Sequence, residues 1–172
     1  SDLITGLMWQ QDPGEKMTYD QAVILADSFA LAGYNDWRLP TIKDLYSLID
    51  FSGTDPSIGT TTNLQPFINT EYFDFTYGDE NAGERIIDSQ FASSTVYTGD
   101  SEFGGGNLMF GVNFADGRIK GYPTGPMPGQ DEGKLFYVLF VRNNTDYGMN
   151  NFIDNGDGTI TDLSTGLIWQ KT

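Results

Sequence analysis

The chain has 172 residues, enough for one domain with its own buried core, and 24 acidic against nine basic residues give a formal net charge of −15. A surface this acidic repels phosphate backbones and anionic lipids, so we expect no nucleic-acid partner. Cysteine and histidine are absent, which excludes disulfides, thiolate-bound zinc and the Ser-His and Cys-His nucleophilic pairs.

Two helices are predicted near the start of the chain, each from a threonine that can cap it and a glycine that ends it. The first begins in a capping-box pattern at Thr18, stops at Gly33 and is expected over about residues 18–32. The second begins at Thr41 and ends at Gly53. Their expected buried faces are Ala22, Leu25, Ala26 and Phe29 in the first helix, and Ile42, Leu45, Tyr46 and Ile49 in the second.

Strand signals return after a long structured loop that we expect from Phe51 to about Gln90. The turn formers at 115–117 lie between two apolar runs and predict a hairpin. The last run is apolar on both faces and is expected to lie in the middle of a sheet. The predicted strands are 91–97, 107–114, 118–122 and 135–142.

The end of the chain repeats its beginning. At an offset of 160, residues 161–171 are identical to residues 1–11 at seven of eleven positions, including a tryptophan and a Thr-Gly turn. Ahead of this second copy, residues 152–160 predict a strand and a turn. We therefore expect a domain over 1–145, followed by a linker and strand tail over 146–172.

This repeat predicts a role in assembly. The same strand at both ends of the chain needs two equivalent positions in a sheet, and a single domain is expected to provide only one such position. Either the tail begins the next domain of a tandem array, or it adds strands to an open edge of a neighbouring subunit. In the third alternative the tail folds back on its own domain as a second edge hairpin. The expected interface residues are Leu3, Leu7, Trp9, Phe152, Ile153, Ile160, Leu163, Leu167 and Trp169.

Four side chains around the turn of the tail are candidate calcium ligands, namely Asp154, Asn155, Asp157 and Asp162. Short acidic side chains interrupted by glycine let several oxygens converge on one hard cation. The spacing departs from an EF-hand, whose bidentate Glu would fall at Ser164, and a plain hairpin turn explains the same residues. Calcium is thus a candidate ligand, and no other cofactor is expected.

Several stretches resemble the Lcl C-terminal domain family, named from a collagen-like bacterial adhesin. They are 5–10, 18–22, 32–41, 91–95, 112–117 and 137–142, and 154–162 is similar to the opening of another such domain. The resemblance implies an α+β fold similar to C-type lectins and formylglycine-generating enzymes. Such a fold has two helices packed on a twisted, mainly antiparallel sheet with long loops, here followed by a C-terminal β-hairpin tail. The chemistry of those enzymes depends on cysteines, so no enzymatic activity is expected here.

Two functions agree with these observations. The first is a non-enzymatic extracellular or cell-surface module whose copies join through the tail into an array or filament. The second is a lectin-like adhesion module that binds a glycan or a protein through the loops 53–90 and 98–106. Acidic residues at 71–88 could pair as in a glycosidase, but a solvated acidic loop explains them better. No membrane span is expected, because the longest apolar run, 135–141, is far shorter than the roughly 20 residues required.

Overall fold

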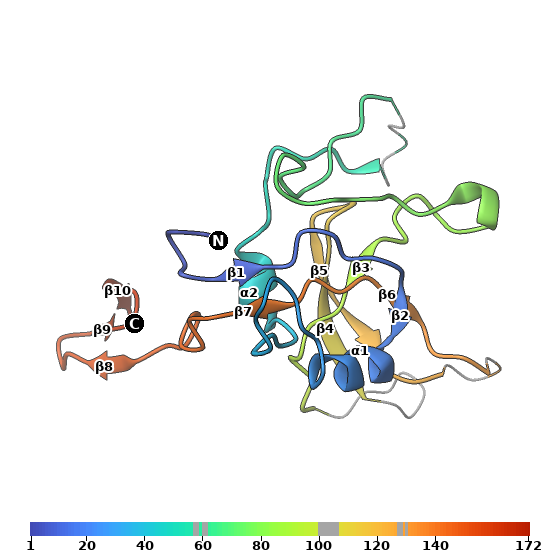
Figure 1. The fold of residues 1–172 in the computed structure, drawn as a ribbon. Coiled ribbons are helices and arrows are strands. Elements are labelled where there is room, and N and C mark those ends of the chain that lie inside the picture. Colours follow the sequence, from blue (N-terminus) through green and yellow to red (C-terminus); the bar gives the residue numbers. More distant parts are fainter. Residues whose placement is uncertain (57–58, 60–61, 100–106, 127–128, 130) are drawn as a thin grey trace.

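The computed structural model describes residues 1–56, 59, 62–99, 107–126, 129 and 131–172. These residues form a mixed α+β fold with two short α-helices and four small antiparallel sheets (Figure 1). The strands of the tail lie apart from the body of the fold, at the left of the view (Figure 1). The elements are β1 (Met8–Trp9), β2 (Met17–Thr18), α1 (Tyr19–Ala26), α2 (Ile42–Tyr46), the 3-10 helix η2 (Glu80–Ala82), β3 (Gln90–Phe91), β4 (Leu108–Asn113), β5 (Arg118–Pro123), β6 (Leu135–Phe136), β7 (Val141–Arg142), β8 (Phe152–Asp154), β9 (Thr159–Asp162) and β10 (Leu167–Gln170).

Both helices begin where their capping signals predict. Thr18 and Gln21 form a reciprocal capping box at α1, and Thr41 and Asp44 form another at α2. Both helices are shorter than expected, however, so the predicted ends near Gly33 and Gly53 are wrong. α1 ends at Ala26, where Asp and Ser follow and compete with the helix for backbone hydrogen bonds.

The chain leaves α1 early because the next aromatic residue has to reach the core. Phe29 stacks on Phe140 with a centroid distance of 4.4 Å and meets Trp37 edge-on at 6.0 Å. After α2, the predicted buried face is only partly confirmed. Leu45 is fully buried, whereas Tyr46 is 49% exposed and packs edge-on against Phe51 at the surface.

The largest sheet has the order β3-β4-β5. Its hairpin β4–β5 is paired over its whole length, from Leu108 with Pro123 to Asn113 with Arg118, as the Asp-Gly turn predicts. Gly117 takes the positive φ of 69° that closes this turn. The predicted strand 91–97 is wrong beyond Phe91, because Ala92 and Ser94 bond to Tyr137 and Pro40, and only residues 95–97 return to β4.

The apolar segment 135–142 is not one strand, because it changes partner along its length. β6 pairs with β2, Tyr137 forms a bridge with Phe91, and β7 pairs with β1. The prediction that both faces are buried is confirmed for Phe136 and for residues 138–141, whereas Leu135 is 46% exposed. Phe136, Val138 and Phe140 enter the core cluster beneath α1, while Leu139 enters the cluster beneath α2. The segment therefore separates the two halves of the core.

Neither described helix has the length or the apolar content needed to cross a bilayer.

Candidate functional site

The repeated sequence at the two ends of the chain folds into the same turn. In the first copy Asp2 accepts hydrogen bonds from the backbone N of Ile4 at 2.9 Å and from Oγ1 of Thr5 at 2.7 Å. Its carbonyl accepts from the backbone N of Gly6 at 3.0 Å, and the backbone N of Leu7 donates to Oγ1 of Thr5 at 3.3 Å. The carboxylate of Asp2 thus caps a tight turn and satisfies its backbone donors.

The second copy makes the same set of bonds, 160 residues later. Asp162 accepts from the backbone N of Ser164 and from Oγ1 of Thr165, both at 3.1 Å. Its carbonyl accepts from Gly166 at 2.8 Å, and the backbone N of Leu167 donates to Oγ1 of Thr165 at 3.3 Å. Even the glycine φ angles agree, at 73° and 72°. The repeat in the sequence is therefore a repeat in structure.

The two copies differ in what covers them. Leu7 is fully buried, and Trp9 is half-buried against the core cluster beneath α2. Their counterparts Leu167 and Trp169 are 52% and 54% exposed. The structure thus places Leu7 in the core of its own domain, whereas Trp9 is half-buried there.

Strand pairing explains this difference. β1 lies against β7, with Met8 opposite Arg142 and Trp9 opposite Val141. The tail sheet has the order β10-β9-β8, so β10 is an edge strand, and the edge that corresponds to the β7 side of β1 has no partner strand among the described residues. The second copy therefore has an open edge where the first copy has a neighbour.

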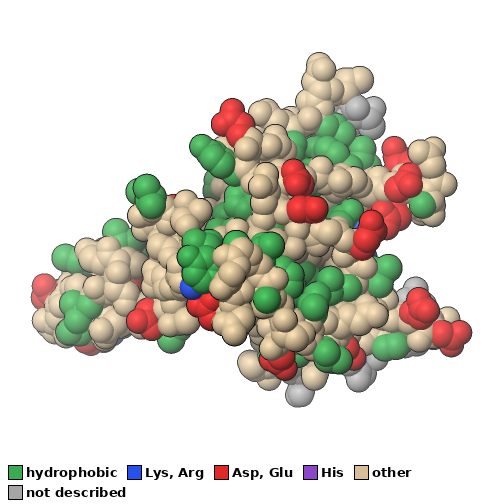
Figure 2. Space-filling view, in the orientation of Figure 1, with side chains coloured by type: hydrophobic (Ala, Val, Ile, Leu, Met, Phe, Trp, Pro, Cys, Tyr) green, Lys and Arg blue, Asp and Glu red, His purple; other side chains and the backbone are tan. Residues whose placement is uncertain are grey.

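One face of the tail sheet carries an apolar cluster. Trp169 is paired with Ile160, and Leu167 and Phe152 both pair with Asp162, so all four apolar side chains point to the same face of the sheet. Phe152 is 59% exposed. Figure 2 shows hydrophobic side chains on the surface of the tail, at the left of the view. Ile153 and Leu163, which were also expected at the interface, are 47% and 56% exposed.

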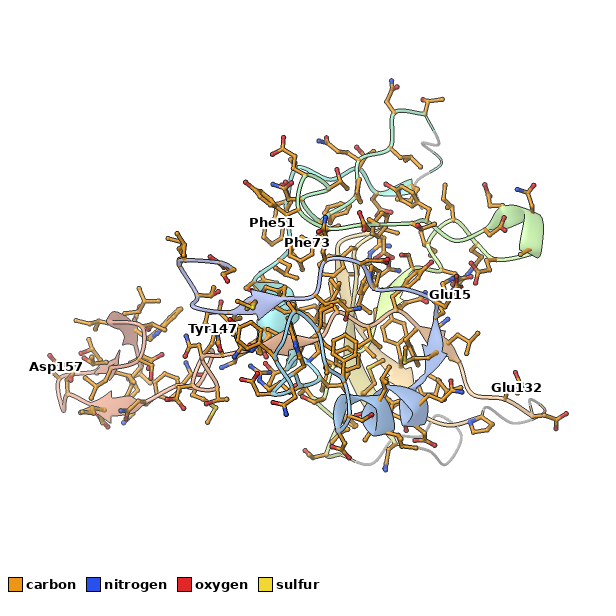
Figure 3. The ribbon with its side chains drawn as sticks, in the orientation of Figure 1. Glu15, Phe51, Phe73, Glu132, Tyr147 and Asp157 are labelled. Atoms are coloured by element: carbon orange, nitrogen blue, oxygen red, sulfur yellow. The ribbon has the colours of Figure 1, made fainter. Side chains whose placement is uncertain are left out.

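A short linker attaches the tail to the body of the fold through contacts that no sequence pattern predicted. Nζ of Lys43, on α2, donates to the carbonyl of Gly148 and, at 2.6 Å, to Oδ1 of Asn150. The side chain of Asn144 donates to the carbonyl of Thr5, and thus reaches the first copy of the turn. In Figure 3, Tyr147 lies in this linker and Asp157 lies at the far end of the tail.

The structure does not bring the four candidate calcium ligands together. No group of three or more His, Cys, Asp and Glu residues in the described parts of the chain could hold a metal ion. Asp154 binds Nζ of Lys171 at 2.5 Å, and Asp157 accepts from the backbone and the hydroxyl of Thr159. Asn155 binds the hydroxyls of Thr159 and Thr161, as a hairpin turn requires.

The fourth candidate, Asp162, is a capping residue. Besides the turn it accepts from the backbone N of Asn151 and from the side chain of Asn150, both at 2.8 Å. These hydrogen bonds hold the pKa of the Asp162 carboxyl below its ordinary value of 3.8, those from Asn151 and Asn150 most strongly.

Acid is therefore expected to disorder the tail. Because the pKa of Asp162 is lowered in the folded tail, its carboxylate stabilises the tail above the ordinary pKa of 3.8 and ceases to do so as the pH falls below it. The amide resonances of Ser164 and Gly166 should lose their dispersion between pH 4 and pH 2, as followed by NMR. The variant Asp162→Ala should show that loss already at pH 7. Sharp, dispersed signals in Asp162→Ala would contradict this role.

Two of the acidic residues at 71–88 form ion pairs. Glu84 binds Nζ of Lys16 at 2.6 Å, and this bond lowers the pKa of Glu84. Asp88 binds the guanidinium of Arg85 at 2.7 Å, which lowers the pKa of Asp88. A glycosidase acid requires a raised pKa instead. The expected ligand loop at 98–106 lies mostly outside the described residues, because positions 100–106 are not among them.

Comparison with known proteins gives a match of residues 1–142 to the family model described as Lcl C-terminal domain. No curated protein and no solved structure matches the chain.

Proposed function

The chain belongs to the Lcl C-terminal domain family, and from this premise we propose that it is a non-enzymatic extracellular or cell-surface module whose copies join through the C-terminal tail. The family match ends at residue 142, so the tail follows the matched region. Within this proposal residues 1–145 form a C-type-lectin-like domain, and residues 146–172 form its linker and connecting strands.

The observation that carries the proposal is the second copy of the turn. It is fully formed, yet no described residue pairs with its outer edge and its apolar face is exposed, while the first copy has both a core and a partner strand. Exposed apolar residues that form a contiguous cluster beside an open strand edge are typical of a site that another chain covers. The tail is therefore proposed to be the connecting element.

Charge and chemistry support the other parts of the proposal. The net charge of −15 disfavours nucleic acid and keeps copies soluble until a specific contact forms. The acidic pairs described above lower carboxyl pKa values, which favours a structural role over catalysis.

Adhesion to a glycan is the second candidate. A groove of about 320 Å³ in the loop after α2 is lined by polar side chains that can hydrogen-bond to sugar hydroxyls, among them Asp50, Gln65, Asn69 and Glu71. A glycan bound there should bind saturably, with an affinity that removal of the tail does not change. Self-association does not require such a ligand.

Weakening the apolar face of the tail is expected to abolish self-association. The double variant Leu167→Ser/Trp169→Ser should lower the association constant by more than about tenfold, since each 1.4 kcal/mol of lost apolar contact is a factor of ten. Both side chains are exposed in the single chain, so its folding should be unaffected. Sedimentation velocity over a range of concentrations and electron microscopy measure the effect.

The matched control is Ile24→Ser, which removes an apolar side chain that is 70% exposed on α1, away from the tail. This variant should associate like the unmodified chain. Discrete small particles of unmodified protein at high concentration would overturn the proposed function, as would equal loss of association in both variants.

A further inference from the structure

The position of β1 beside β7 fits a strand with the sequence of β10, because β1 and β10 belong to the two copies of the repeat. Two residue pairs join β1 to β7, and Gln10 adds a backbone bond to the carbonyl of Phe140 at 2.9 Å. The Gln10 side chain accepts from the backbone N of Phe140 at 3.0 Å. Such a short pairing leaves most of the attachment of residues 1–11 to the buried Leu7 and the half-buried Trp9.

β10 can remake each of these contacts, since the residues concerned are the same. Leu167 matches the buried Leu7, Trp169 matches Trp9, and Gln170 matches Gln10. Thr165 repeats Thr5, whose carbonyl accepts the bond from Asn144. The Met8 position is filled by Ile168, which keeps an apolar side chain there. The turn geometry ahead of the strand is already formed in the tail, so little ordering is needed.

A groove continues this place on the other side of β1. It has a volume of about 530 Å³, and Phe73, labelled in Figure 3, belongs to its wall. Half of its lining belongs to residues 1–11, and the wall that remains when these leave is formed by Ser47, Leu48, Asn69, Tyr72 and Phe73. Among the described residues β1 pairs with β7 alone, so the edge of β1 toward the groove is open.

The tail shows which strand fits this groove. In the tail, β9 lies on the side of β10 that corresponds to the open edge, with Ile160 opposite Trp169. Beside β1, the corresponding place runs from Ser1 along Trp9, which is where the groove lies. Its apolar wall can cover the Ile160 and Phe152 side chains that the tail leaves exposed or half-buried.

When the tail of another copy takes the place of residues 1–11, three strands enter and one leaves, and burial favours this exchange. The incoming tail brings β8 and β9 with it and buries an apolar face that is open in the free chain. The outgoing residues 1–11 expose Leu7 and Trp9, whereas Leu3 and Ile4 are already 93% and 94% exposed. The exchange therefore increases the buried apolar area, and the contact joins the tail of one copy to the front of the next. Head-to-tail contacts of this kind produce rings or open filaments.

We propose that the tail of one copy displaces residues 1–11 of a second copy, so that β10 takes the place of β1 beside β7 and β8–β9 fill the adjoining groove. This inference rests on the proposed function and specifies its receiving site.

Cysteine pairs test the register, because the chain has no cysteine of its own. Met8 and Arg142 face each other, and Nη1 of Arg142 lies 3.6 Å from Sδ of Met8. In the exchanged arrangement Ile168 takes the Met8 position. A mixture of full-length Ile168→Cys and Arg142→Cys chains should therefore form disulfide-linked dimers on oxidation, as seen by non-reducing electrophoresis.

The control mixture pairs Arg142→Cys with Ser164→Cys, which is an exposed position in the tail. Its counterpart in the first copy, Ile4, is 94% exposed and does not pair with β7. It should give at least about tenfold fewer dimers, since a disulfide requires close Cα atoms. A second variant, Met8→Cys/Arg142→Cys, locks β1 onto β7 when oxidised. Oxidation should abolish assembly and reduction should restore it, which also shows that the variant folds.

The outcomes separate the two proposals. Assembly that persists in the locked variant, without the specific crosslink, would overturn strand exchange and leave the assembly function standing. That result would also follow if the groove is filled by a hairpin joined directly ahead of Ser1. Absence of assembly in the unmodified chain under all conditions would overturn both.

Discussion

Replacing Leu7 by alanine is expected to lower the free energy of unfolding by about 2–5 kcal/mol, whereas Leu167→Ala should change it by less than about 0.5 kcal/mol. The two leucines have the same place in the same turn, and their backbone N atoms make the same 3.3 Å bond. Leu7 is fully buried, and Leu167 is 52% exposed. The local geometry is the same in both copies, so the difference between the two changes in unfolding free energy measures the contribution of burial. Urea denaturation at low protein concentration, followed by tryptophan fluorescence, gives both values.

Varying the protein concentration provides the control for these two variants. If the tail is buried in a second copy, the cost of Leu167→Ala should appear only at concentrations where copies associate, because binding stabilises the folded state by mass action. Leu7→Ala should be costly at every concentration. An equal, large cost of both variants in dilute solution would show that the tail packs on its own domain, and it would contradict the assembly function.

Signals that lie within a few residues of sequence allowed correct predictions. The capping box of α1, the Thr41 cap of α2, the Asp-Gly hairpin and the strands of the tail were predicted, because side chains at fixed spacing determine these features. The repeat was also evident, since Asp, Thr and Gly at fixed spacing specify the turn in both copies. The burial of both faces of 135–142 followed from its uninterrupted apolar run.

Features that depend on distant segments were not predicted. α1 ends early because Phe29 packs on Trp37 and Phe140, and periodicity within the helix carries no information on those partners. The same reason explains why 135–142 was expected as one strand, although it pairs with four segments in the described part of the chain. At the site, identical sequences predicted identical interface roles for Leu7 and Leu167, but only tertiary packing shows that one is in a core and the other is exposed.

The second large effect on stability is expected when the buried ion pair at the start of α2 is broken. Asp44 is fully buried, and its Oδ2 accepts from the Arg38 guanidinium at 2.6 Å and from the backbone N of Thr41 at 2.8 Å. Its Oδ1 is buried without a hydrogen-bond partner among the described residues. The carboxylate therefore depends on Arg38 for its charge compensation.

Arg38→Ala is expected to lower the free energy of unfolding by about 3 kcal/mol, because it leaves a buried carboxylate without its cation. The double variant Arg38→Met/Asp44→Leu removes both charges and loses the capping bond to Thr41, so it should cost only about 1 kcal/mol. A double-mutant cycle in urea, with Asp44→Leu as the remaining corner, measures the coupling. Arg38→Lys is the matched control and should fall between the extremes, since lysine retains the charge but not the planar fork. If the cost of the double variant equals the sum of the two single costs, the residues are not coupled, and the burial of Asp44 depends on its cap alone.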